Sequence, residues 1–109
     1  MDIVGIPFHT IDWTSMETTH HQGETGYAIW KTIHIGNIRV RQVEYSVDYK
    51  ANHWCTKGHI LLCMEGEMIT ELMDGRMFVL KEGTSYQVGD NMEAHRSFTK
   101  IGCKLFIVD

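Results

Sequence analysis

The sequence predicts an all-β protein that folds as a single domain. Apolar and polar residues alternate with a period of two over much of the chain, whereas helical periodicity is hard to find. Short apolar runs also recur between turns that contain glycine, which is typical of an antiparallel sandwich or barrel. The 109 residues are enough for one hydrophobic core and too few for two.

The N-terminal part divides into an irregular arm and the first two strands. Residues 1–25 are expected to form the arm, with a short helical turn at most, packed on the barrel or on a partner subunit. Residues 26–109 are expected to form the barrel itself. Residues 27–35 alternate as a strand, Gly36-Asn37 supplies a turn, and a second strand runs over residues 38–47.

After a polar loop near residues 48–52, the rest of the chain consists of short strands separated by turns at regular intervals. The Asp74-Gly75 pair is the strongest hairpin signal in the sequence, because this dipeptide suits a two-residue turn. The expected strands cover residues 60–64, 68–73, 76–80, 84–88, 96–99 and 104–108, with Glu65-Gly66 as the turn between the first two.

Composition and charge argue against several classes of protein. The net charge is -4 and no run of Lys or Arg occurs, so nucleic acid is not an expected partner. No stretch is long and apolar enough to cross a membrane, and the start Met1-Asp2-Ile3 does not resemble a signal peptide. An odd number of cysteines, three, favours free thiols in a reducing compartment, so we expect a cytoplasmic protein.

The most informative segment places three metal-ligand types within seven residues. On a strand, His53 and Cys55 would point to the same face, and Gly58 would let His59 open the next strand beside them. His95, from a glycine-rich loop further on, is the natural fourth ligand. Imidazole and thiolate suit zinc, iron or copper better than magnesium or calcium. The alternative interpretation is a group of partly buried, hydrogen-bonded polar residues, with Cys55 as a small apolar side chain.

The spacing of these residues resembles the two motifs of the cupin superfamily. The first motif corresponds to His53-x-Cys55, His59 and Gly66, and the second to Gly83, the strand 84–88, the loop 89–91 and His95. Cys55 stands where most cupins have a histidine, and His59 stands where they have a glutamate. The chain is most similar to the small bacterial cupin-fold proteins named for a DHCW motif, through Gly23-Glu24-Thr25-Gly26, His53-Trp54-Cys55, Lys57-Gly58-His59, Asp74-Gly75-Arg76, Ser85-Tyr86-Gln87-Val88 and His95-Arg96-Ser97.

This resemblance implies a fold and a range of functions. The fold would be the cupin jelly-roll barrel, a double-stranded β-helix, preceded by the short arm. The resemblance implies a divalent transition metal (zinc, iron, nickel or manganese) held by His53, Cys55, His59 and His95. The protein would bind or act on a small organic molecule, as a metal-dependent oxygenase, isomerase or related enzyme. The alternative is a non-catalytic module that binds a small ligand or senses redox state or metal.

Further residues are candidates for a ligand pocket or for an interface. Arg41 could aim a cation at an anionic ligand, and Glu44 and Tyr86 could act as acid or base if their faces point inward. Cys63 and Cys103 lie in apolar strands and are expected to be buried core residues. Small cupins frequently form homodimers, and an exposed sheet edge together with the arm would give a physical reason for one here.

Overall fold

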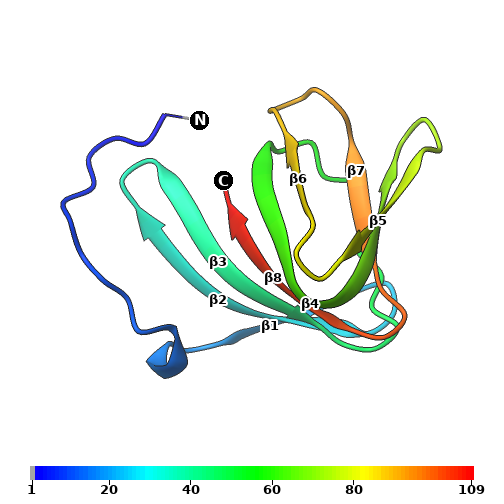
Figure 1. Ribbon diagram of the computed structural model, residues 1–109, viewed down its shortest axis with the longest axis horizontal. Helices are drawn as coiled ribbons and strands as arrows, with labels where there is room; N and C mark the ends of the chain where they lie inside the picture. Colours follow the sequence, from blue (N-terminus) through cyan, green and yellow to red (C-terminus); the bar gives the residue numbers. More distant parts are fainter. Residues whose placement is uncertain (1) are drawn as a thin grey trace.

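The computed structural model describes residues 2–109 and consists almost entirely of antiparallel strands (Figure 1). The strands run in the sheet order β1-β2-β3-β8-β4-β5, while β6 and β7 also pair with β4. Within this part of the chain, no helix is long and apolar enough to cross a membrane. The elements are η1 (Trp13–Ser15), β1 (Thr19–Gln22), β2 (Tyr27–Ile35), β3 (Ile38–Tyr45), β4 (His59–Leu72), β5 (Met77–Lys81), β6 (Ser85–Val88), β7 (His95–Phe98) and β8 (Cys103–Val108).

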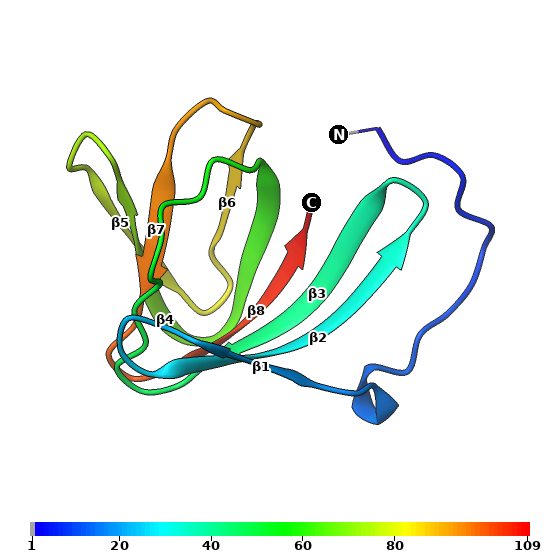
Figure 2. The same ribbon diagram turned by 180° about the vertical axis from the view of Figure 1, so that it is seen from behind.

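The all-β jelly-roll prediction is confirmed, and most of the expected strands lie where the alternation placed them. The strand at residues 27–35 has the same bounds in the structure as in the prediction. The Gly36-Asn37 and Asp74-Gly75 turns connect neighbouring antiparallel strands. In the arm, η1 is the expected short helical turn, and β1 adds a further strand that pairs with β2, as Figure 2 shows from behind.

One long strand, β4, replaces two predicted ones. The sequence predicted a turn at Glu65-Gly66, but the strand continues through these residues as a bend. Gly66 has a φ of +78°, and the register against β8 shifts between Cys63 and Glu65. The limb before the bend pairs with β6 and β8, and the limb after it pairs with β5 and β7 (Figure 1). The bend therefore lets a single strand contribute to both sides of the barrel.

The interior is apolar at one end and polar at the other. On β8 the inward side chains of Leu105 and Ile107 are followed by Asp109, which is also buried. On β4 and β3 the same change occurs toward the same end, from Leu61 to His59 and from Val43 to Arg41. The predicted burial of two cysteines is confirmed in the apolar part, which comprises Ala28, Val43, Leu61, Cys63, Met68, Leu80, Cys103, Leu105 and Ile107.

Candidate metal centre

Three of the four predicted metal ligands meet at the polar end of the barrel. The potential ligand atoms of Cys55, His59 and His95 all lie within 4.8 Å of one another. His59 is the first residue of β4 and His95 the first residue of β7, and their rings meet edge to face with centroids 4.9 Å apart. Cys55 is fixed beside His95 by two backbone hydrogen bonds of 2.7 and 3.0 Å. The fold thus joins residues that lie far apart in the sequence.

The fourth predicted ligand, His53, lies outside this group. Residues 51–58 form a loop rather than the expected strand, and only Cys55 makes a bridge there, to His95. The His53 side chain is exposed and its Nδ1 hydrogen-bonds Oδ1 of Asn52 at 2.8 Å. His53 and Cys55 both line the cavity around the cluster, but His53 is not among the residues whose ligand atoms lie within 4.8 Å of one another.

Two ring nitrogens of the cluster are buried without a partner. Nδ1 of His95 lies 2.9 Å from the Glu93 carbonyl and donates to it, so in the neutral ring the lone pair is on Nε2. That Nε2 is buried and has no hydrogen-bond partner among residues 2–109. The same is true of Nδ1 of His59, whereas its Nε2 lies 2.6 Å from the Tyr86 hydroxyl. A buried polar atom left unpaired costs about 1–3 kcal/mol, which a bound metal would offset.

The protonation states of two of the three side chains also suit metal binding. The neighbouring His95 ring lowers the pKa of the Cys55 thiol, while the thiol raises the pKa of His95. Burial lowers the pKa of His59 to about 4, so this ring is neutral at pH 7. Burial also raises the pKa of Tyr86, whose phenol therefore keeps its proton. Thiolate and neutral imidazole are the forms in which these side chains bind metals, so the shifts of Cys55 and His59 favour binding. The raised pKa of His95 favours its protonated ring, so a metal ion would have to displace that proton from Nε2.

The metal-free protein should lose stability in acid because of His59. Its folded-state pKa of about 4 lies below the ordinary value of 6.5, so the unfolded chain binds more protons between these limits. The free energy of unfolding should therefore fall by about 2 kcal/mol as the pH drops from 6.5 to 4. Urea unfolding of chelator-treated protein measures this, and His59→Gln should flatten the profile. An equally steep profile in that variant would assign the loss to other groups.

A buried ion cluster lies next to the candidate ligands. The Asp109 side chain is 1% exposed and accepts two hydrogen bonds from Arg39, at 2.8 and 2.9 Å, and one from Arg41 at 3.2 Å. Burial would raise the pKa of Asp109, but the hydrogen bonds and charges of the two arginines outweigh it and lower the pKa. Oδ2 of Asp109 is also 3.9 Å from Nδ1 of His59, which connects the ion cluster to the metal ligands.

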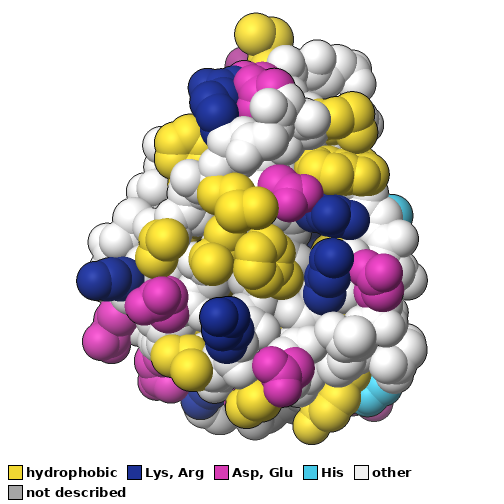
Figure 3. Space-filling model, turned by 90° about the vertical axis from the view of Figure 1, so that its right-hand side faces the viewer, with side chains coloured by type: hydrophobic (Ala, Val, Ile, Leu, Met, Phe, Trp, Pro, Cys, Tyr) yellow, Lys and Arg dark blue, Asp and Glu magenta, His cyan; other side chains and the backbone are white. Residues whose placement is uncertain are grey.

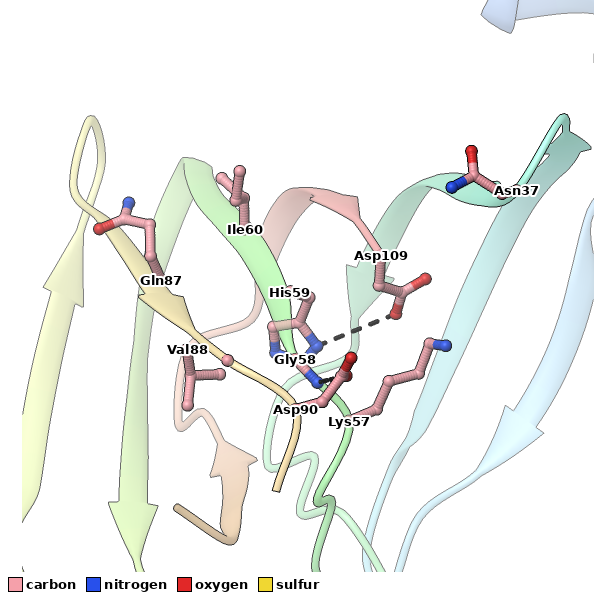
Figure 4. A pocket seen from close by; sticks show the side chains of 10 residues that line it. Asn37, Lys57, Gly58, His59, Ile60, Gln87, Val88, Asp90 and Asp109 are labelled. Carbon is pink, nitrogen blue, oxygen red and sulfur yellow. Dashed lines mark hydrogen bonds and ion pairs between the residues drawn. The ribbon is translucent and has the colours of Figure 1, made fainter. Parts of the chain in front are cut away.

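A cavity of about 220 Å³ encloses the cluster, and a wider groove of about 530 Å³ lies beside it. His59 and Asp109 line both spaces, and Figure 4 shows them facing each other in the groove with Lys57 and Asp90 nearby. The predicted pocket residues Arg41 and Tyr86 are in the cavity wall. Glu44 instead lies on the exposed outer face of β3, because its parity is opposite to that of Arg41.

The sequence analysis did not identify Asp109, the carboxylate at the centre of the buried ion cluster. The signal was present, because Leu105, Ile107 and Asp109 share one parity and the first two are apolar. Extending the alternation by one step would have placed the carboxylate inside the barrel.

Comparison with solved structures identifies the fold. An RmlC-like cupin from Shewanella frigidimarina superposes with a TM-score of 0.74, covering 96% of this chain and 92% of that protein at 16% identity. The chain has the cupin fold. Ectoine synthase from P. lautus, with a TM-score of 0.74 and 14% identity, covers 93% of this chain and 76% of its own. A Neisseria meningitidis protein is 25% identical over 73% of this chain and 79% of its own, with a TM-score of 0.60.

The cupin fold accounts for where the two predicted motifs lie. The first motif covers the loop before β4 and the first limb of that strand, and the second covers β6 and the start of β7. Both motifs therefore contribute to the polar part of the barrel, where His59 and His95 meet. No protein-family model and no curated protein matches the sequence. The likeness to the DHCW-motif proteins stays a prediction.

Proposed function

We propose that this cupin binds a divalent transition metal through Cys55, His59 and His95, and uses it to bind or act on a small organic molecule. The observation that carries the proposal is the buried Nε2 of His95, unpartnered within the described chain and close to a thiol and a second imidazole. One sulfur and two nitrogen donors favour zinc, iron or nickel over manganese, which prefers oxygen ligands.

The spacing of the three side chains is close to what a metal requires. Zinc–nitrogen and zinc–sulfur bonds of about 2.0–2.3 Å place the ligands of a tetrahedral site about 3.3–3.8 Å apart. The ligand atoms here lie within 4.8 Å, so small side-chain rotations would close the site. Three protein ligands leave one position open, as in catalytic zinc sites, whereas four would close it.

The remaining cavity residues would orient a bound molecule. A metal held at this site would supply Lewis-acid character toward a carbonyl or hydroxyl oxygen of that molecule. Tyr86 lines the same cavity and keeps its phenolic proton, so it can donate a hydrogen bond to such an oxygen. The groove that shares His59 and Asp109 with the cavity offers a route from solvent.

Metal analysis of the purified protein tests the proposal. Protein prepared without an affinity tag under reducing conditions should contain about one transition-metal ion per chain, because the three ligands converge. Cys55→Ser and His95→Ala should each reduce the metal content per chain at least about tenfold, as measured by elemental mass spectrometry. His53→Ala is the matched control and should retain the metal. A wild-type protein without metal, or variants with unchanged content, would contradict the proposal.

A redox- or metal-sensing module is the second candidate. It is favoured by Cys55, which is half-buried and whose pKa is lowered by His95, since thiolates react fastest with oxidants. Cobalt substitution separates the two functions. Cobalt absorption bands that shift when azide is added would indicate an exchangeable coordination position on the metal, as ligand binding and catalysis require. Bands that ignore small anions would favour a closed sensing site.

The homodimer remains a proposal as well. It is supported by the free edge of β1 and by apolar side chains over β5 in the second half of the barrel. Figure 3 shows apolar side chains on one face of the molecule with charged ones around them, and Met77 and Val79 are about half exposed, at 57% and 51%.

A further inference from the structure

Arg41 differs from the other arginines of the cavity wall in how its charge is balanced. Arg39 forms a two-bond pair with Asp109, and Arg96 pairs with Glu71 at 3.0 Å. Arg41 makes a single hydrogen bond within residues 2–109, from Nη2 to the already shared Asp109 at 3.2 Å. Two guanidinium groups thus depend on one carboxylate.

The Arg41 guanidinium is also buried and held in place. The residue is 6% exposed, and its Nε is buried with no hydrogen-bond partner in the described part of the chain. The group lies over the Trp30 ring, 4.4 Å from its centroid, and Trp30 is itself stacked on His21 of β1 at 3.7 Å. A fixed, desolvated and incompletely paired cation is costly by itself, so this arrangement is prepared for an anion.

The charge of the cavity leads to the same expectation. Arginine stays protonated in proteins, and Arg41 faces the space that Cys55 and His95 also line. A divalent ion on a Cys55 thiolate would add one further net positive charge. The interior would then carry two uncompensated positive charges, one at the arginine pair and one at the metal cluster, around a cavity of about 220 Å³. This volume is below the range of about 300–1,000 Å³ for drug-sized ligands, so only a small anion fits.

We propose that the ligand of this cavity is a small carboxylate whose anionic group binds Arg41 while a second donor group lies at the metal cluster. Arg39 shows that an arginine of this cavity can bind a carboxylate through two hydrogen bonds, one to each side-chain oxygen of Asp109. Tyr49, Leu61 and Ile107 add apolar surface to the cavity wall. The metal end of this assignment rests on the proposed function, whereas the Arg41 end rests on the ion pairs described above.

The test compares an acid with its uncharged amide. Calorimetry of the protein as purified, with a phosphine reductant present, gives the Kd of 3-mercaptopropionate and of 3-mercaptopropionamide, which share the thiol and differ in charge. Wild-type protein should bind the acid about ten to a hundred times more tightly, since hydrogen bonds between charged groups are the stronger ones. Arg41→Gln should bring the ratio near one. Arg76→Gln, which removes an exposed arginine that pairs with Asp74 and Glu93 outside this cavity, should leave the ratio unchanged.

Two further measurements keep the outcome decisive. Circular dichroism checks that Arg41→Gln folds, and Arg41→Lys serves if it does not; this variant keeps the charge but loses the planar fork, and should lower the ratio at least about threefold. A ratio of the two Kd values near one in the wild type, or a ratio that is the same in both Arg41 variants as in the wild type, would overturn the assignment. Metal content is measured on the same samples. Absence of metal would contradict the proposed function alone, and an Arg41-dependent ratio would still support the carboxylate.

Discussion

Replacing Asp109 by asparagine is expected to lower the free energy of unfolding by about 3–5 kcal/mol at pH 7. The substitution keeps the size of the side chain but removes the only carboxylate that Arg39 and Arg41 reach in the described chain. Arg41 is almost fully buried, so its charge would remain in a medium of low polarity without a counterion. Urea unfolding of wild type and variant, monitored by tryptophan fluorescence, measures the loss.

A surface pair provides the control for this prediction. Glu65 and Lys104 lie 3.5 Å apart with both side chains about half exposed, so Glu65→Gln should change stability by less than about 1 kcal/mol. The Asp109 substitution should also cost less in an Arg41→Gln background, because one of the two stranded charges is then absent. A loss below about 1 kcal/mol for Asp109→Asn would mean that water or another group solvates the arginines.

Gly66→Ala is expected to destabilise the protein by about 3 kcal/mol or more, since it combines backbone strain with a steric clash. The φ of +78° is one that side-chain-bearing residues rarely adopt. A Cβ at this position would lie 2.2 Å from the Gly102 carbonyl oxygen and 2.9 Å from Cα of Cys103. Both atoms belong to backbone, so the bend in β4 would have to open. Thermal unfolding followed by circular dichroism measures the effect.

Gly75→Ala separates the backbone strain from the steric clash. Gly75 in the β4–β5 hairpin has a φ of +96°, but a Cβ there would meet no described atom within 4 Å. This variant should therefore show the backbone strain alone, about 1–2 kcal/mol. Equal losses in the two variants would show that the contact with Gly102 is relieved at little cost.

The fold could be predicted from the sequence to the extent that it depends on local pattern. Alternation gave β2 its bounds, and Asp74-Gly75 gave the hairpin, because both are properties of adjacent residues. The course of β4 could not be predicted in this way. A glycine after a glutamate is compatible with a turn or with a bend, and only the pairing with β8, far along the chain, selects the bend.

The candidate site shows the same division. Motif spacing predicted that His59 and His95 would lie near each other, and their rings are 4.9 Å apart between centroids. His53 was placed by assuming a strand, and the structure has a loop there, so its orientation could not follow from parity. The shared use of Asp109 by two arginines depends on the β3–β8 register, which no local pattern encodes.

The position of β8 between β3 and β4 has a consequence for how the chain folds. The strands β1–β3 have no hydrogen-bonded contact with β4 in the described sheet except through residues 103–108, which follow all the other strands in the chain (Figure 1). Until those residues are available, β3 and β4 both keep an open edge, which is the type of surface that associates between chains. Barrel closure is therefore a late, non-local event, and folding should be slow for a chain of this size.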